Sequence, residues 1–281
     1  MDLHVEVAPE VLGRVPFPGT NFELLITNSF FTMLLVMGGL LIVGTLIARR
    51  STLIPGHVQA VFELLAEFML NLVESAAGKT FARRIFPLVG GVFIFILFAN
   101  FSGLLPGMET IHWDVDGYDI PVLRPPSADL NMTIAMALVT FMAVQFFGIS
   151  AHGFIGRIKH MADPPFLFPI EVISEFSRII SLSFRLFGNV FAGEVLLGVM
   201  YTIASIIKIS VVGLLIPVVF LYLEVLFGAI QALVFALLTL IYIVLASAHH
   251  DEGHEEPAAE QEVASQASSS ESVPHGSVSG D

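Results

Sequence analysis

Long apolar stretches separated by short charged ones dominate the first 248 residues of this chain. The stretch from residue 24 to residue 48 contains no charged side chain and stops at Arg49 and Arg50. At 1.5 Å per residue it is longer than the roughly 30 Å of hydrocarbon in a bilayer. We therefore predict a membrane-spanning helix over residues 24–48, preceded by an irregular N-terminal arm over residues 1–22.

Two further apolar stretches have the same character. Residues 85–108 and 130–156 contain no Lys, Arg, Asp or Glu, and each is long enough to cross a bilayer. The loop between them is acidic and contains Asp114, Asp116 and Asp119. We predict that residues 85–108 and 130–156 form the second and third spanning helices.

The segment 57–77 has a different pattern, in which apolar and polar residues recur at helical spacing on opposite sides. The apolar side consists of Val58, Val61, Leu65, Phe68 and Leu72, and the polar side of Gln59, Glu63, Glu67, Asn71 and Glu74. This pattern predicts an amphipathic helix with too many charges on one face to span the membrane exposed to lipid. It lies in the membrane interface or packs against a partner, and we favour the interface.

Two very long apolar segments follow, over residues 170–208 and 210–248. As continuous helices each is about 57 Å long, which exceeds a 30 Å core at ordinary tilts. Their apolar composition argues against projection into water. We predict two oblique helices that form a hairpin within the membrane, with its turn near residue 209.

The composition supports this assignment. Hydrophobic residues make up 55% of the chain and charged residues only 13%, with a mean hydropathy of +0.84; soluble domains have about 25% charged residues. Eight of the 25 acidic residues follow residue 249, where there is no Lys or Arg. Residues 249–281 therefore predict a disordered acidic tail. Nothing indicates nucleic-acid binding, a cofactor or a metal site, and there is no Cys to form a disulfide.

Basic residues set the expected orientation. They cluster in loops that fall on one side of the predicted spans, namely Arg49, Arg50, Lys79, Arg83, Arg84, Arg157 and Lys159. By the positive-inside rule these loops are cytoplasmic, with the N-terminus outside and the C-terminus inside. The predicted fold is an all-α integral membrane protein with a membrane domain over residues 23–248. It has about five spanning helices, the last two long and oblique, and an interfacial amphipathic helix.

Arg185 is the most informative residue in these apolar stretches. An arginine keeps its proton in proteins, and an ionisable residue at membrane depth marks a functional site with a partner. Arg185 lies about 24 Å from Pro169 along the helix, farther than a side chain reaches to the interface. A polar stripe lies on its side of the helical wheel and consists of Glu171, Ser174, Arg178, Ser181 and Asn189, with Glu175 at the margin. The alternative is that Glu171, Glu175 and Arg178 form a solvated first turn and that each serine bonds only to its own helix.

A second set of polar residues faces elsewhere. Glu194 is half a turn round from Arg185 and about 13 Å farther along. On the last helix Glu224, Gln231 and Tyr242 share one face, and a hairpin brings Glu194 and Glu224 near one another. Together these residues predict two polar tracks separated by a fixed cation, which repels protons unless a partner's mobile carboxylate carries them. The alternative is two glutamates satisfied by backbone and buried water.

The motifs that contain these residues resemble one family closely. Ser181-x-x-x-Arg185-Leu-Phe-Gly-Asn189-x-x-Ala-Gly-Glu194 is similar to the hallmark of the a subunits of F-type ATP synthases. The run Gln231-Ala-x-x-Phe-x-x-Leu-Thr-x-x-Tyr242 is similar to their final helix. The likeness extends from about residue 20 to residue 248.

The resemblance implies a stator subunit of a rotary ATP synthase, not catalytic alone, with two proton half-channels to and from the carboxylates of a c-subunit ring. Arg185 matches the family's essential arginine, which separates the half-channels, and Asn189, Glu194 and Gln231 match the proton path. Glu224 stands where some members have His.

The expected partners are the c ring, b-type peripheral stalk subunits, the remaining ATP synthase subunits and the lipid bilayer. The expected location is the inner membrane of a bacterium rather than an organelle. The alternative functions are a self-contained ion channel or secondary transporter, and a sodium-translocating version of the same subunit.

Overall fold

The computed structural model describes residues 9–16, 23–50, 55–105, 111–115, 118–161, 166, 168–206 and 210–248. The predicted acidic tail over 249–281 and the predicted turn near residue 209 lie outside these ranges. So do residues 1–8 and 17–22 of the predicted N-terminal arm.

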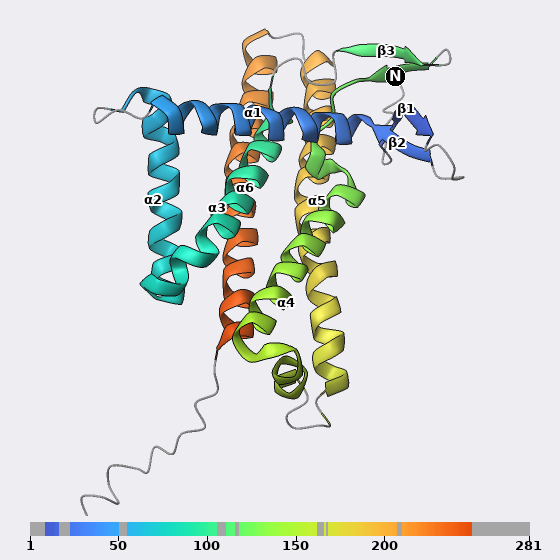
Figure 1. Ribbon diagram of the computed structural model, residues 1–281. Helices are drawn as coiled ribbons and strands as arrows, with labels where there is room; N and C mark the ends of the chain where they lie inside the picture. The colour runs from blue at the N-terminus through green and yellow to red at the C-terminus, as the bar shows by residue number, and fades with distance from the viewer. Residues whose placement is uncertain are drawn as a thin grey trace, which may run out of the picture. The chain divides into compact units, whose positions relative to one another are not determined.

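Six α-helices make up most of the described chain (Figure 1). They are α1 (Asn28–Arg50), α2 (His57–Ala77), α3 (Lys79–Ser102), α4 (Leu130–Met161), α5 (Phe168–Ile206) and α6 (Ser210–Ser247). All except α2 contain a stretch long and apolar enough to cross a membrane. The prediction of an all-α membrane protein with five spanning helices and one amphipathic helix is confirmed.

Two short hairpins and a 3₁₀ turn interrupt the helical pattern. Strands β1 (Val11–Pro16) and β2 (Glu23–Thr27) pair antiparallel, as do β3 (His112–Val115) and β4 (Tyr118–Pro121). The turn η1 (Pro126–Ala128) precedes α4. Strand β1 corrects the prediction of a wholly irregular arm before residue 23.

The first helix begins at Asn28, four residues later than predicted. The hydroxyl of Thr27 accepts a hydrogen bond from the backbone N–H of Phe30 at 3.2 Å, which is the geometry of a helix cap. Residues before this cap pair with β1 instead. Hydrophobicity alone does not reveal the boundary, because Leu24, Leu25 and Ile26 of β2 are as apolar as the helix that follows them.

The third helix begins and ends about six residues earlier than predicted. The predicted segment 85–108 becomes α3, which begins at Lys79 and ends at Ser102. Lys79, Arg83 and Arg84 therefore lie in the first turns of a helix and not in a loop. Gly103 follows as the C-cap, and in the tight turn there the N–H of Leu104 donates to the carbonyl of Phe101 at 3.1 Å.

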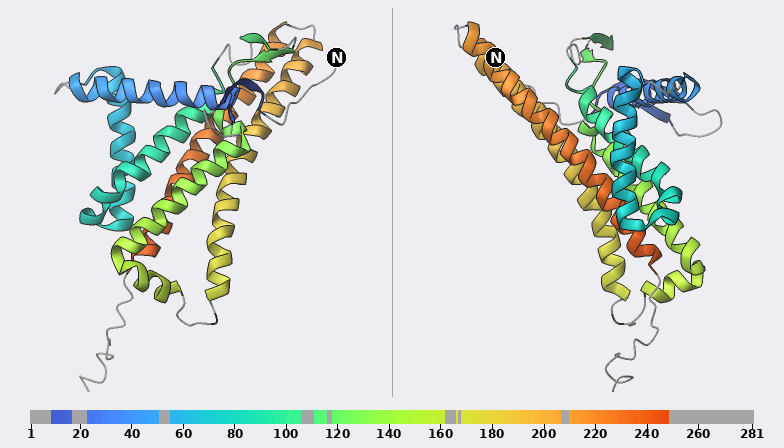
Figure 2. Two further views of the ribbon diagram at one scale, coloured as in Figure 1. Left: turned by 45° about the vertical axis from the view of Figure 1, so that its right-hand side comes forward. Right: turned by 90° about the vertical axis from the view of Figure 1, so that its left-hand side faces the viewer.

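Helix α1 runs crosswise to α2 and to the pair formed by α5 and α6, as the views in Figures 1 and 2 agree. Its surface is almost wholly uncovered by the rest of the chain, with 6% of its apolar window buried. Helix α3, by contrast, is 56% buried and packs against α2 and α6. The core of the fold therefore lies mainly between α3 and α6, with contributions from α2, α4 and α5.

A polar contact joins α3 to α6 inside this core. Asn100 donates a hydrogen bond from Nδ2 to the carbonyl oxygen of Gly228 at 3.1 Å. A side chain on Gly228 would bring its Cβ to 3.3 Å from the Cβ of Asn100. The glycine therefore lets the asparagine approach the backbone of α6.

Helix α2 has three distinct sides. Met69 and Val73 are buried in the core, whereas Glu63, Glu67 and Asn71 are exposed on the polar side. Between these sides runs an exposed apolar stripe of Val58, Val61, Leu64 and Phe68. The predicted apolar face is thus divided between the core and an uncovered surface, which is the division that an interfacial helix requires.

Helix α4 changes direction at Gly153, whose φ of 73° lies in the left-handed region that favours glycine. The helical segment after it brings Arg157 back toward the body of the helix. A Cβ on Gly148 would lie 3.0 Å from Nε of Arg157 and 3.2 Å from the carbonyl oxygen of Ala246. Gly148 thus makes room for a charged side chain and for the backbone of α6.

We expect Gly148→Ala to destabilise the protein by about 1–3 kcal/mol, because the carbonyl of Ala246 is part of a helix and cannot move independently. The matched control is Gly91→Ala on α3, where an added Cβ meets no atom within 4 Å; it should be neutral or slightly stabilising. Thermal unfolding of the purified protein in detergent distinguishes the two. Equal melting temperatures would contradict the close packing at Gly148.

Candidate functional site

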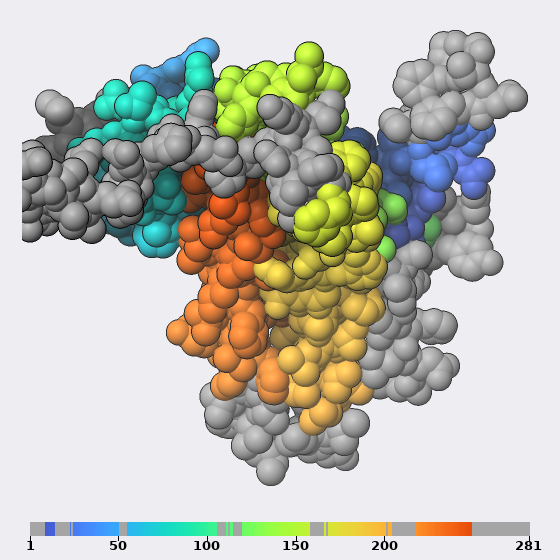
Figure 3. Space-filling model, turned by 90° about the horizontal axis from the view of Figure 1, so that it is seen from below, coloured from blue at the N-terminus to red at the C-terminus, as the bar shows by residue number. Residues whose placement is uncertain are grey.

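Arg185 occupies an exposed position on α5. Among the residues that the structure describes, none forms an ion pair or a hydrogen bond with it. The helices α5 and α6 also have exposed apolar side chains, namely Ile173, Phe176, Ile180, Phe184, Tyr222, Leu226 and Ile230. Figure 3 shows the two helices side by side on one face of the molecule. We call these residues and Arg185 the open face; its single charge calls for a partner beyond the described chain.

A cavity of about 390 Å³ lies between α5 and α6, next to the core. Asn189, one turn from Arg185, lines it together with Glu224 and Asn100. Its other walls are mostly apolar, and include Val190, Leu196, Leu197, Phe220, Leu223 and Phe227. The cavity is large enough for several waters and places polar groups of three helices at its surface.

Glu224 lies directly against Gly193, where a Cβ would stand 2.7 Å from Cδ of the glutamate. The carboxyl group of Glu224 thus occupies the space that a side chain on α5 would fill. Gly193 is adjacent in sequence to Glu194, so the structure brings Glu224 to the turn of α5 where Glu194 lies.

Glu194 also has a cationic partner that the sequence analysis missed. Its Oε2 lies 3.6 Å from Nη2 of Arg124, and the side chains are 19% and 7% exposed. The sequence analysis considered only Glu224 as a neighbour of Glu194. The available signal was that Arg124 is the single basic residue in an otherwise acidic loop, just before two prolines.

The segment that contains Arg124 is held in place by α1. The backbone N–H of Arg124 donates to the hydroxyl of Thr32 at 3.2 Å, and Nδ2 of Asn28 donates to the carbonyl of Pro121 at 3.2 Å. All of these groups except Pro121 are buried. The start of α1 therefore fixes the loop that places a guanidinium beside Glu194.

Gln231 lies two turns after Glu224 on α6 and is buried, with 8% of its surface exposed. Its Nε2 has no hydrogen-bond partner in the described ranges. Buried amide N–H groups normally have a hydrogen-bond partner. The unpaired Nε2 of Gln231 is therefore consistent with a side chain that changes its hydrogen-bond partner during function.

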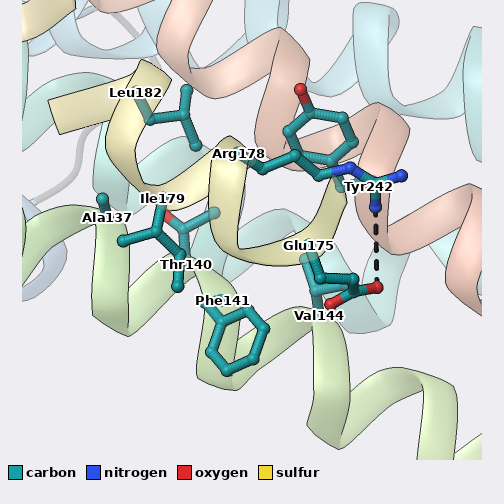
Figure 4. A pocket seen from close by; sticks show the side chains of 9 residues that line it. All are labelled: Ala137, Thr140, Phe141, Val144, Glu175, Arg178, Ile179, Leu182 and Tyr242. Atoms are coloured by element: carbon teal, nitrogen blue, oxygen red, sulfur yellow. Dashed lines mark ion pairs between the residues drawn. The ribbon is translucent and has the colours of Figure 1, made fainter. Parts of the chain in front are cut away.

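A cluster of charged groups occupies the other end of α5 (Figure 4). Glu175 accepts a hydrogen bond from Arg157 Nη2 at 2.9 Å and another from Gln145, and its Oε1 lies 3.6 Å from Nη1 of Arg178. The guanidinium of Arg178 stands 4.7 Å from the ring centroid of Tyr242. We call Gln145, Arg157, Glu175, Arg178 and Tyr242 the inner cluster.

Glu171 is joined to the inner cluster by a single contact, 3.6 Å between its Oε1 and Nη2 of Arg178. Its side chain is 42% exposed, compared with 6% for Glu175. Ser174 is half-buried and Ser181 is exposed, and neither bonds to another group in the part of the chain that the structure describes. The predicted polar stripe along α5 is thus connected at Glu171 but not at the two serines.

The inner cluster contains residues that the sequence analysis did not select as functional. Arg157 was placed in a loop, whereas it is buried within α4 and reaches Glu175 across eighteen positions. No set of three His, Asp or Glu side chains suited to hold a metal occurs among the described residues.

Comparison with known proteins gives a consistent result. Residues 29–244 match the family model described as ATP synthase A chain. The chain is 38% identical over 191 residues to ATP synthase subunit a of Moorella thermoacetica, covering 68% of this chain and 76% of that protein. It is 34% identical over 180 residues to the proteins of the same name from Helicobacter pylori strain Shi470 and Helicobacter acinonychis, covering 62% of this chain and 72% of each.

We expect Gly193→Ala to destabilise the protein by less than the roughly 1–3 kcal/mol of overpacking against backbone, because the new methyl group displaces the flexible end of the Glu224 side chain. Shortening the acid in the double variant Gly193→Ala/Glu224→Asp should restore much of the loss, which thermal unfolding measures as a double-mutant cycle. Gly188→Ala on the same helix is the control, since a Cβ there meets no atom within 4 Å. Additive effects at positions 193 and 224 would contradict the contact.

Proposed function

The chain belongs to the ATP synthase A chain family, and from this we propose that it is the proton-conducting stator subunit of a rotary F-type ATP synthase. In this role it provides two half-channels to the carboxylates of a c-subunit ring. The observation that carries the proposal is Arg185, a permanent cation on the open face with no counter-charge among the described residues of its own chain.

The cavity between α5 and α6 suits the outer half-channel. Asn189 and Glu224 line it, Glu194 lies beside it, and Gln231 continues along α6 with an unused donor. Two acidic groups and two amides can pass a proton through intervening water to a ring carboxylate at the open face. Glu171, with Ser174 and Ser181 on the same side of α5, forms the inner half-channel.

Arg185 separates the two routes. A bare proton that approaches a fixed guanidinium in a low-dielectric region is repelled, so direct passage between the half-channels is blocked. A carboxylate on the ring pairs with the guanidinium when ionised and leaves it when protonated. Protons therefore move only with the ring, which converts a gradient of about 2.3 kcal/mol per charge per 100 mV into rotation.

The crosswise arrangement of the helices supports a specific placement in the membrane. With α1 across the bilayer, α2 lies along the interface with its apolar stripe toward lipid, and α5 and α6 lie oblique to the membrane normal. The basic ends of α1 and α3 then face the cytoplasm and the β3–β4 loop faces outside. The N-terminus is outside and residues 249–281 form a cytoplasmic tail of the membrane domain over 23–248.

The relatives come from bacteria, which supports the inner membrane of a bacterium. ATP chemistry belongs to other subunits of the complex, and the expected neighbours are the c ring and b-type stalk subunits. A self-contained channel or secondary transporter requires its own moving counter-charge, and Arg185 has none within the described residues.

We expect Arg185→Ala to abolish ATP-driven proton pumping while leaving the complex assembled, and to open a passive proton leak. The reason is that the variant removes the barrier between the half-channels. Proton flux into vesicles that contain the purified complex measures both effects. Arg83→Ala, an exposed arginine of α3, is the control and should pump normally. Normal coupling in Arg185→Ala would exclude the proposed mechanism.

We expect Glu224→Gln and Glu194→Gln each to slow pumping at least about tenfold, because an amide cannot carry a proton along the outer route. The measurement is repeated with protons and then with sodium as the only permeant ion. Pumping by the unmodified complex only when sodium is present would favour the sodium-translocating alternative. Full activity of both variants would remove these residues from the path.

A further inference from the structure

The inner cluster holds two arginines and a glutamate where burial makes charges costly. The side chains of Arg157 and Glu175 are 7% and 6% exposed, and they pair at 2.9 Å between α4 and α5. Removing two charges from water costs several kcal/mol per ion, and a buried pair often recovers little more than that cost. Stability alone is therefore a weak reason for these charges.

Both carboxylate oxygens of Glu175 are engaged with donors, which disfavours a role as a proton relay. Its Oε1 accepts from Arg157 and faces Arg178, while its Oε2 accepts from Gln145. The side chain of Gln145 also accepts from Nε of Arg157 at 3.3 Å. Each carboxylate oxygen is thus engaged with a donor, and the group is held in one orientation.

The local backbone is arranged to produce this contact. The left-handed conformation of Gly153 turns the chain, and the absence of a side chain at Gly148 leaves room for Arg157. Two glycines therefore position a guanidinium whose main contact is Glu175.

The space inside the cluster is too small to conduct. A cavity of about 10 Å³, lined by Thr140, Glu175, Arg178 and Tyr242, has room for about one water. The cavity beside Glu224 measures about 390 Å³. We therefore place the inner cluster beside the proposed inner half-channel and not in the path of the protons.

Arg178 is the link between the inner cluster and the exposed acid. Its Nη1 lies 3.6 Å from Glu175 and its guanidinium covers Tyr242, while its Nη2 lies 3.6 Å from Glu171. A single cation is thus shared between a buried carboxylate and an exposed one. The stronger the interaction of Arg178 with Glu175, the weaker its stabilisation of the charge on Glu171.

We propose that Glu175, fixed by Arg157 and Gln145, is a positioning residue that holds Arg178 between itself and Glu171 and so sets the proton exchange of Glu171 with the cytoplasm. This inference rests on the proposed function, in which Glu171 ends the inner half-channel. It adds that Glu171 exchanges protons, whereas Glu175 fixes the position of Arg178 beside it.

Among the described residues, Arg178 is the group in direct contact with Glu171. The titratable and charged groups that contact Arg178 or Glu175 in turn are Arg157 of α4 and Tyr242 of α6. The turn η1 also packs against α5. Its neighbour Arg124 pairs with Glu194, which is 23 residues from Glu171 along α5.

The test measures ATP-driven proton pumping by the assembled complex in vesicles, with the pH of each side set separately. In Glu175→Gln, Glu171 is the remaining carboxylate beside Arg178, so Arg178 stabilises the charge of Glu171 more strongly than in the unmodified protein. We expect the half-maximal pH on the cytoplasmic side to fall by at least about half a unit, with no change on the outer side. The double variant Arg157→Gln/Glu175→Gln should shift the profile equally without leaving a buried unpaired arginine.

Two variants serve as controls. Arg157→Lys keeps the charge that fixes Glu175 and should retain a normal profile, while Glu67→Gln makes the same chemical change on the exposed side of α2 and should have no effect. Unchanged profiles in both test variants, or a shift on the outer side, would overturn the inference. So would failure of both to assemble, because the cluster would then be structural.

The outcome is separable from that of the proposed function. Arg185→Ala is measured in the same vesicles, and its continued coupling would reject the stator mechanism whatever Glu175→Gln does. Loss of coupling in Arg185→Ala together with normal pH profiles in both test variants would reject the role of Glu175 alone.

Discussion

A guanidinium that cannot lose its proton, placed on an apolar face, is the constraint on which the rest of this structure depends. Arg185 is exposed on α5, a helix with other exposed side chains that are apolar, and it has no ion pair among the described residues. Such a charge is tolerated only when another group meets it, because the cost of burying an unpaired ion is several kcal/mol. The remaining polar groups lie to either side of it and leave the open face to a partner.

The two sides are built differently. On one, small residues admit polar groups to a cavity, as Gly193 does for Glu224 and Gly228 does for Asn100. On the other, the charges are packed tightly around Glu175 and only Glu171 is substantially exposed. The cavity of about 390 Å³ leaves room for water between mostly apolar walls, whereas the inner cluster holds its charges in fixed contacts. The protein therefore has an open cavity on one side of a single cation and a tightly packed cluster on the other.

Much of this was predictable from the sequence, and the reasons for the rest are physical. Length and apolar composition determine the spanning helices, and the depth of Arg185 follows from its distance to the nearest chain break. The pairing of Arg124 with Glu194 depends on a tertiary approach between positions seventy apart, which helical periodicity does not encode. The return of Arg157 depends on one positive φ at Gly153. The start of α1 is hidden by the apolar run of Leu24, Leu25 and Ile26, which belongs to a strand. The roles of the site residues in proton transfer stay predictions.

The two ion pairs of α5 have a mechanical consequence. Arg157 ties the helix to α4 at Glu175, and Arg124 ties it to the loop before η1 at Glu194. Arg185 lies ten residues after the first attachment and nine before the second, so it stands at midspan, about 14 Å from each. In the proposed function, a ring that turns against the open face pulls on α5 between these two ion pairs. The ion pairs oppose movement of α5 along its axis and so keep Arg185 in position.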